Sequence, residues 1–284
     1  MDQAGAKKLS PTQIDPRLDR VARLVGETGL ARLARAHVII FGVGGVGSSA
    51  AEALARSGVG RITLIDGERV CPTNVNRQLH ALESSIGRPK AEAMAERMRL
   101  INPALRVEPI AEHYGAHNAE RLLPAGADTS FVIDAIDTVT AKLHLLARCV
   151  RERIPVVSTM GAAGRLDPTA VRVSDLCESH TDQLAKDVRK YLRRNYGIDC
   201  TVPTGILAVW SHEKARLPLS LPGDEDGIPG VVGPAPEHRA PKGQGSAIFV
   251  TSVFGMTAAS VAVRALLGEP TAGARPKNTV VSPD

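Results

Sequence analysis

Six residues, 42–47, constrain the fold of this chain more than any other feature of its sequence. The run Gly42-Val43-Gly44-Gly45-Val46-Gly47 has the spacing G-x-G-x-x-G. Residues 37–41 (HVIIF) precede it as a short apolar run typical of a buried strand, and the alanine-rich segment 48–57 that follows favours a helix. A second apolar run, 61–65, ends in Asp66. Glycines in this setting let backbone approach a phosphate at a helix amino terminus, so we predict a nucleotide site; the alternative is a tight turn without a ligand.

Further strand and helix patterns alternate along the rest of the chain. We predict strands over 105–110, 131–133, 155–159 and 169–173, helices over 88–101, 139–153, 182–195 and 246–267, and a helical arm over 17–34. Strands that alternate with helices are typical of a parallel sheet covered on both faces. The predicted fold is therefore α/β and Rossmann-like: a doubly wound, mainly parallel sheet with an N-terminal helical arm and a C-terminal extension of strands and helices.

The length of 284 residues and the 43% hydrophobic content suit one large globular unit. We expect a flexible N-terminus over 1–16, a nucleotide-binding domain with its arm over 17–175, and a C-terminal part of the same fold over 176–267. A mobile loop is expected over 217–245, which is rich in Pro and Gly, and a disordered tail over 268–284.

The four cysteines form no C-x-x-C pair, which argues against structural zinc and against a disulfide framework. This pattern suits a reducing cytoplasm. Cys71 and Cys177 are candidate thiol nucleophiles, with idle or buried thiols as the alternative. Residues 246–267 are long and apolar enough to span a membrane, but they contain Arg264 and several hydroxyl side chains. We therefore favour a buried core helix over membrane association.

Polar residues of the types that bind nucleotide phosphates follow the predicted strands. Asp66 is placed to bind ribose hydroxyls. The loop beyond it contains N-V-N-R-Q, with Asn74, Arg77 and Gln78, and Lys90 follows twelve residues after Gln78; Asp134 and Asp137 end a later strand. All these positions lie at the carboxyl edge of a parallel sheet, where ligands bind. Cations and a carboxylate able to hold Mg²⁺ suit a triphosphate better than hydride transfer with NAD. The alternative is that Arg77 and Lys90 are solvated surface charges.

Together these motifs resemble the ubiquitin-activating-enzyme-like superfamily, the group of ThiF, MoeB and HesA. The resemblance covers about residues 17–175 and rests on G-V-G-G-V-G-S, Asp66, N-x-N-R-Q, Lys90 and D-A-I-D. It implies a ligase-type enzyme that adenylates a carboxylate with ATP and Mg²⁺.

A narrower resemblance, to the tRNA threonylcarbamoyladenosine dehydratase branch, rests on V-N-R-Q-L-H-A-L, V-I-D-A-I-D and G-R-L-D-P-T. It implies ATP-dependent dehydration and cyclisation of N6-threonylcarbamoyladenosine in tRNA through carboxylate adenylation. Two alternatives stay open: adenylation of the C-terminus of a ubiquitin-like sulfur carrier, and a nucleotide-binding partner without catalysis. The nucleophile of the cyclisation, a cysteine thioester and a sulfur-transfer protein partner are also left open.

The resemblance also implies roles for individual residues. The phosphates would be lined by Gly42, Gly44, Gly45 and Gly47, and the ribose would be held by Asp66. The nucleotide would also contact Asn74, Arg77, Gln78 and Lys90. Asp137 would hold Mg²⁺. Arg23, in the helical arm, would reach the ATP of the neighbouring subunit, which implies a homodimer. MoeB-type zinc cysteines are missing here, as they are in the dehydratase branch. A cysteine that some dehydratases carry before the final helix is absent from residues 242–246 (KGQGS).

Two further features have two readings each. The predicted helix 182–195 carries five cations within 186–194, which either bind tRNA phosphates or form a solvated face. Its neighbours Tyr191 and Tyr196 either stack on unpaired bases or pack inward. His80 follows N-R-Q and either donates to a phosphate or stabilises the loop.

Overall fold

The computed structural model describes residues 14–126, 128–219 and 244–271. It contains one sheet of seven strands in the order β3-β2-β1-β4-β5-β7-β6. The strands are β1 (His37–Phe41), β2 (Arg61–Ile65), β3 (Arg106–Ile110), β4 (Phe131–Asp134), β5 (Val156–Thr159), β6 (Val171–Asp175) and β7 (Leu207–Ser211). Neighbouring strands are parallel, except that the edge strand β6 runs antiparallel to β7.

The middle of the sheet is apolar on both faces. All residues of β1, β4 and β5 are buried, which explains their continuous apolar sequences, because a parallel sheet has helices on both sides. The edge strands β3 and β6 are partly exposed. The parallel strands bring their carboxyl ends to one edge, and the loops of the predicted site leave from that edge.

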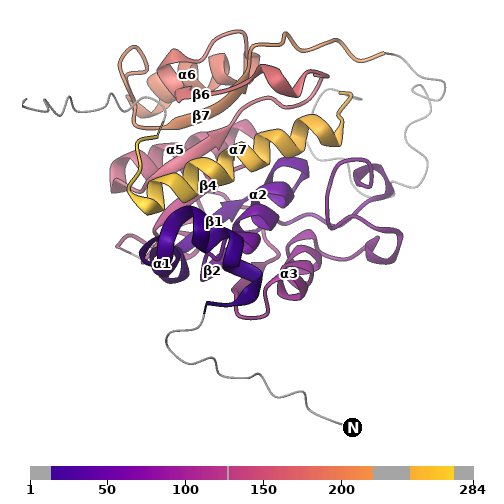
Figure 1. Cartoon of the computed structure of the whole chain (residues 1–284). Coiled ribbons are helices and arrows are strands. Elements are labelled where there is room, and N and C mark those ends of the chain that lie inside the picture. Colours follow the sequence, from indigo (N-terminus) through magenta and orange to yellow (C-terminus); the bar gives the residue numbers. More distant parts are fainter. Residues whose placement is uncertain (1–13, 127, 220–243, 272–284) are drawn as a thin grey trace, which may run out of the picture.

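Helices cover the two faces of the sheet in two layers (Figure 1). The first layer contains α1 (Asp19–Arg35), α2 (Gly45–Arg56), α3 (Lys90–Ile101) and α7 (Ile248–Leu267). The second contains α4 (Ala119–Leu122), α5 (Val139–Glu152) and α6 (Gln183–Tyr196). The described residues also contain five short 3-10 turns: Pro16–Leu18, Pro72–Asn74, Glu83–Ser85, Pro168–Ala170 and Leu176–Glu178.

Helix α7 corresponds to the apolar segment 246–267, for which the sequence allows either a core helix or a membrane span. It is the one helix of the described residues that is long and apolar enough to cross a bilayer. In the fold it lies across the sheet beside α2 (Figure 1). At Gly255 a Cβ atom would lie 2.3 Å from the carbonyl oxygen of Val46, so the two helix backbones nearly touch. The apolar residues on this side of α7, such as Phe254, belong to the core.

The predicted fold class is confirmed, and the differences are local. Helix α2 begins at Gly45, inside the glycine run and three residues before the predicted start, because Gly44 is already its N-cap. Strand β7 and the short α4 were not predicted. The expected flexible N-terminus (1–16), mobile loop (217–245) and disordered tail (268–284) lie mostly outside the described residues and stay predictions. The division at residue 175 also stays a prediction, although β6 and β7, on either side of it, pair in one sheet.

Candidate active site

The glycine loop connects β1 to α2 with almost no room for side chains. Gly42 has φ +86°, and a Cβ atom on it would lie 2.5 Å from the carbonyl oxygen of Ala135. A Cβ on Gly47 would lie 1.8 Å from the carbonyl oxygen of Gly42. Gly44 is the open position, where a Cβ would meet nothing closer than Gln78 Nε2 at 3.9 Å. The loop is therefore tight on its protein side and open at the start of α2, where a helix amino terminus favours an anion.

Asp66 ends β2 beside this loop, as predicted. Its Oδ2 accepts a hydrogen bond from Val43 N at 2.6 Å, and its Oδ1 accepts one from Glu68 N at 2.8 Å. Burial raises the pKa of Asp66, and the two backbone N–H groups and Lys90 oppose that shift only in part. A carboxylate has about four lone-pair sites, so two donors leave capacity for ribose hydroxyls.

The loop that carries N-V-N-R-Q folds back over the glycine loop. Asn74 is buried, and its Oδ1 accepts a hydrogen bond from Cys71 N at 3.0 Å. Arg77 Nη1 donates to Thr73 O at 2.8 Å and to Asn76 Oδ1 at 3.0 Å. Gln78 is buried with no hydrogen-bond partner for its Oε1 among the described residues. Asn74 and Arg77 thus stabilise their own loop.

Lys90 is buried, with 3% of its surface exposed, and begins α3. Its Nζ forms an ion pair with Glu68 Oε2, and its backbone N donates to Glu68 O. Burial would raise the pKa of Glu68, but Lys90 outweighs it, so the pKa lies below its ordinary value. Lys90 is therefore no solvated surface charge. Sequence reasoning missed Glu68; its only signal was a carboxylate two residues after Asp66.

His80 is a buried imidazole close to Lys90. Both ring nitrogens lack a hydrogen-bond partner in the part of the chain that the structure describes. Burial, helped by the charges of Lys90 and Arg97, lowers the pKa of His80 to about 4. The ring is therefore neutral at physiological pH. Within the described residues the ring therefore makes no hydrogen bond that would cap the loop.

The last residue of β4 and the segment that follows it place two aspartates near the glycine loop, in different environments. Asp134 is fully buried, and its Oδ2 accepts from Lys142 Nζ and from Ser158 Oγ, both at 2.6 Å. Asp137 is exposed, and its only recorded hydrogen bond within the described residues comes from Thr138 Oγ1 at 3.4 Å. Ala135, between them, packs against Gly42. Asp134 thus anchors the segment, while Asp137 has oxygen atoms available to a ligand.

Residues from the far end of the chain complete this edge of the sheet. A Cβ on Gly45 would lie 3.1 Å from Thr251 Oγ1, and Asn76 Nδ2 donates to Ser246 O at 2.8 Å. The amino terminus of α7 thus supports both the glycine loop and the N-V-N-R-Q loop. No local sequence pattern links these segments, so Thr251 and Ser246 were not predicted.

Arg23 is the one predicted site residue that lies elsewhere. Its Nε pairs with Asp19 Oδ2 at 3.0 Å, and 71% of its side chain is exposed. The arm packs against the carboxyl end of α7, where a Cβ on Gly29 would contact Leu267. That point lies sixteen residues from Thr251, about 24 Å along the helix. Arg23 therefore does not join the site of its own chain.

The predicted cationic helix is α6, and one of its five cations is not free. Arg189 is half-buried, and its Nη1 donates to Leu176 O at 3.3 Å and to Ser179 O at 2.7 Å. Helix α6 therefore exposes four of these cations, whereas both readings of the sequence need all five at the surface. Tyr191 and Tyr196 are partly buried and pack against the second core layer, which favours the inward reading.

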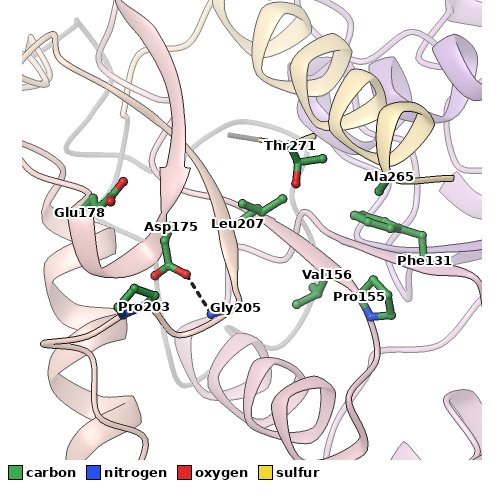
Figure 2. A pocket seen from close by; sticks show the side chains of 10 residues that line it. All are labelled: Phe131, Pro155, Val156, Asp175, Glu178, Pro203, Gly205, Leu207, Ala265 and Thr271. Carbon is green, nitrogen blue, oxygen red and sulfur yellow. Dashed lines mark hydrogen bonds between the residues drawn. The ribbon is translucent and has the colours of Figure 1, made fainter. Parts of the chain in front are cut away.

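Neither the thiol of Cys177 nor a cavity at the opposite edge of the sheet belongs to this site. Burial and nearby acidic groups raise the pKa of Cys177 to about 11, so its thiol is protonated at neutral pH. A cavity of about 350 Å³ lies at the opposite edge of the sheet, beside Phe131, Val156 and Leu207 (Figure 2). Its carboxylate Asp175 already accepts a hydrogen bond from Gly205 N at 2.8 Å.

Known proteins resemble this chain in sequence and in fold. The sequence model of the ThiF family matches residues 18–283. The tRNA threonylcarbamoyladenosine dehydratase of Escherichia coli (strain K12) is 42% identical over 261 residues, which cover 89% of this chain and 94% of that protein. The crystal structure of the E. coli enzyme, TcdA, in complex with ATP has a TM-score of 0.77 at 40% identity, again covering 89% and 94% of the two chains. Its complex with AMP has a TM-score of 0.78 at 41% identity, with the same coverage. The match of both sequence and fold over most of its length shows that this chain belongs to the ThiF family.

Proposed function

We propose that this protein uses ATP to adenylate the carboxylate of N6-threonylcarbamoyladenosine in tRNA, and so drives its dehydration to a cyclic form. The observation that carries the proposal is the meeting of the glycine loop, Asp66, Lys90 and Asp137 at one edge of the sheet. Relatives that cover most of the chain are tRNA threonylcarbamoyladenosine dehydratases, one of which was crystallised with ATP and with AMP.

Each side of the nucleotide has a matching group in the proposed site. The open start of α2, with Gly44 and Gly45, suits the phosphates, and Asp66 suits the ribose. Lys90 and Arg77 supply positive charge, and Asn74 and Gln78 supply amide groups. Lys90 would exchange part of its pairing with Glu68 for phosphate oxygens. Because Gln78 Oε1 lacks a partner in the described structure, a bound nucleotide is a suitable donor to it.

The reaction needs two displacements. A carboxylate oxygen of the substrate attacks the α-phosphorus of ATP, and pyrophosphate leaves. An internal nucleophile of the substrate then attacks the activated acyl carbon, loses its proton, and displaces AMP, which retains the carboxylate oxygen. The net change is loss of one water from the nucleoside, with ATP converted to AMP and pyrophosphate. Lys90 and Arg77 would stabilise the charge that builds up in the first step.

Asp137 fits a magnesium ligand, because it is an exposed carboxylate with one long hydrogen bond, at the edge where the phosphates would lie. Mg²⁺ prefers one or two carboxylates together with phosphate oxygens. When bound, the ion would neutralise phosphate charge. Asp134 keeps its buried partners and would position the segment rather than bind metal.

The position of Arg23 supports a homodimer in which the arm of one subunit completes the site of the other. The guanidinium is exposed and lies far from its own glycine loop, so in this proposal the arm of a second chain would bring Arg23 to the site. We place the protein in the cytoplasm, where its tRNA substrate is found. A sulfur-transfer protein partner remains a further proposal.

Pyrophosphate release tests the proposal against its alternatives. We expect release with tRNA that carries N6-threonylcarbamoyladenosine, and none with unmodified tRNA. Release that depends on a small protein ending in Gly-Gly would favour sulfur-carrier activation instead. ATP binding without turnover under either condition would favour the third alternative, a nucleotide-binding partner protein without catalysis. Asp137→Ala should lose at least tenfold in rate, about 1.4 kcal/mol of transition-state stabilisation, while ATP-free stability stays unchanged.

A further inference from the structure

Three aromatic rings form a cluster beside the outer strands of the sheet. His180 and His212 each lie edge-on to Trp210, with ring centroids 4.4 Å and 4.7 Å from it, and 4.6 Å from each other. Trp210 is buried, and its Nε1 donates to Ser174 Oγ at 3.0 Å. Both histidines are exposed. The tryptophan thus holds two imidazole rings at the surface.

The cluster lies on the same edge as the proposed adenylation site. His212 follows the carboxyl end of β7, which is parallel to β5, and β5 is parallel to β4. Strands in a sheet are about 4.8 Å apart, so the end of β7 lies roughly 10 Å from the end of β4, where Asp137 follows. A substrate that reaches Asp137 along this edge passes the rings.

Exposed cations without carboxylate partners lie on the strand β6 and the helix α6, the two elements next to the rings in the chain. Arg172 is the cross-strand neighbour of Trp210, is exposed, and donates through Nη1 to Thr169 O and Val171 O at 2.8 Å. Four exposed cations follow on α6: Lys186, Lys190, Arg193 and Arg194. None of these five has a carboxylate within 4.0 Å among the described residues. Many other arginines of the chain do have one, for example Arg61 and Arg121.

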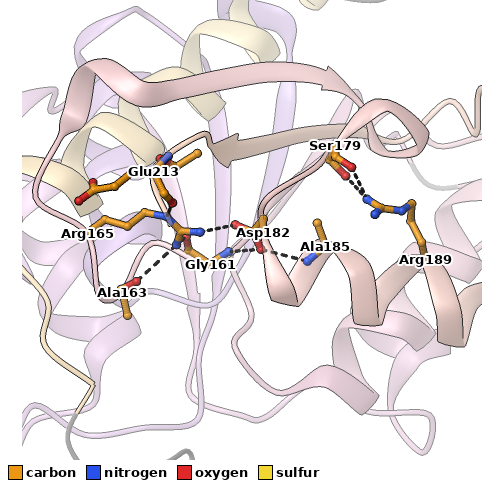
Figure 3. Close-up of polar contacts among 9 residues, drawn as sticks. Gly161, Ala163, Arg165, Ser179, Asp182, Ala185, Arg189 and Glu213 are labelled. Carbon is orange, nitrogen blue, oxygen red and sulfur yellow. Dashed lines mark hydrogen bonds and ion pairs between the residues drawn. The ribbon is translucent and has the colours of Figure 1, made fainter. Parts of the chain in front are cut away.

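A buried ion pair fixes the cluster and α6 relative to each other. Asp182 Oδ1 accepts a hydrogen bond from Ala185 N at 3.0 Å and so caps α6, and its Oδ2 pairs with Arg165 Nη2 at 2.9 Å (Figure 3). Arg165 Nε in turn donates to Glu213 O at 3.0 Å, next to His212. The Glu213 carboxylate accepts hydrogen bonds from the backbone N–H groups of residues 166 and 167. The carboxylates of Asp182 and Glu213 are therefore occupied by these partners.

We propose that Arg172, His180, His212 and the four exposed cations of α6 form the tRNA-binding surface of this protein, with an unpaired base against the imidazole rings and phosphates against the cations. The proposal rests on the proposed function, which makes tRNA the substrate. Sequence-specific RNA recognition uses unstacked bases on aromatic or histidine rings, and basic side chains bind the backbone. Rings near the reaction edge and exposed cations on the neighbouring elements β6 and α6 meet both requirements.

Trp210 is the single tryptophan of the chain, so its fluorescence reports on this surface alone. The probe is tRNA that carries N6-threonylcarbamoyladenosine, titrated into the wild-type protein, into Arg172→Glu and into the double variant His180→Ala/His212→Ala. We expect the tRNA to change the emission of the wild type. We expect Kd to rise at least tenfold in both variants, and the salt dependence of Arg172→Glu to flatten by about one phosphate contact.

Arg106→Glu is the matched control, because Arg106 is an exposed arginine on β3, the opposite edge strand. It should bind tRNA within twofold of wild type, and all variants should keep their affinity for ATP. Variants of the proposed surface that bind tRNA as tightly as the control would overturn the proposal, even if the wild type makes the cyclic product. A wild type that neither binds this tRNA nor makes product would instead overturn the proposed function, and the surface with it.

Discussion

The buried ion pair between Lys142 and Asp134 gives a quantitative test of how the site is held. Both side chains are fully buried. Lys142 Nζ donates to Asp134 Oδ2 at 2.6 Å and to Thr159 O at 3.1 Å, and Asp134 Oδ1 accepts from Ile136 N at 3.1 Å. Replacing Lys142 with Met keeps most of the volume but leaves the carboxylate without its cation. An uncompensated buried charge costs about 3–5 kcal/mol, so we expect a loss of roughly 10 °C or more in Tm.

Urea denaturation of four proteins measures this coupling: the wild type, Lys142→Met, Asp134→Asn, and the double variant. The Asp134→Asn substitution removes the charge but leaves an amide oxygen that still accepts hydrogen bonds, so the double variant should be more stable than Lys142→Met by about 2 kcal/mol or more. ATP affinity should follow the same order, because Ala135 packs on Gly42. A loss under about 1 kcal/mol in Lys142→Met, or a double variant as unstable as that single variant, would refute the reasoning.

Three other perturbations test separate parts of the structure. Gly47→Ala should cost about 3 kcal/mol of unfolding free energy without ATP, because its Cβ would meet Gly42 O at 1.8 Å. Gly44→Ala should change the unfolding free energy by no more than about 1 kcal/mol. Equal losses for the two variants in urea denaturation would contradict this prediction. Mixed Arg23→Ala and Asp137→Ala subunits should regain pyrophosphate release through hybrid dimers, and a mixture as inactive as its parents after proven subunit exchange would exclude a shared site. On going from pH 7.5 to pH 5, the wild type should lose about 2 kcal/mol more unfolding free energy than His80→Leu. The reason is that the unfolded imidazole gains a proton below its ordinary pKa of about 6.5, whereas the buried ring, with a pKa of about 4, does not. Parallel pH profiles of stability for the two proteins would exclude this role of His80.

The sequence predicts those parts of the fold and of the candidate site whose residues lie close together along the chain. The apolar runs of β1 and β2, the glycine spacing and Asp66 all lie within thirty residues of one another, and the structure joins them as expected. Strand β7 had a usable signal, the apolar run 206–210 after Gly205, but it lies where the alternation of strands and helices becomes irregular.

Local sequence patterns could not predict the contacts between segments that lie far apart along the chain. The helical spacing of the α6 cations placed Arg189 with the others, but the carbonyl of Ser179, on a turn outside the helix, turned its guanidinium inward. Likewise, nothing near Lys90 showed that it would be buried against Glu68. Periodicity describes one element at a time, whereas the pairing of a charge depends on which other elements pack against it.

The central claim, that adenylation drives ring closure of the tRNA nucleoside, is tested most directly by the mass of that nucleoside. The purified protein is incubated with ATP, Mg²⁺ and tRNA that carries N6-threonylcarbamoyladenosine, and the digested nucleosides are analysed by mass spectrometry beside the AMP formed. The account predicts a nucleoside lighter by one water molecule, produced in equal amount with AMP and absent without ATP. An unchanged nucleoside after ATP has been converted to AMP, or a lighter one formed without ATP, would contradict it.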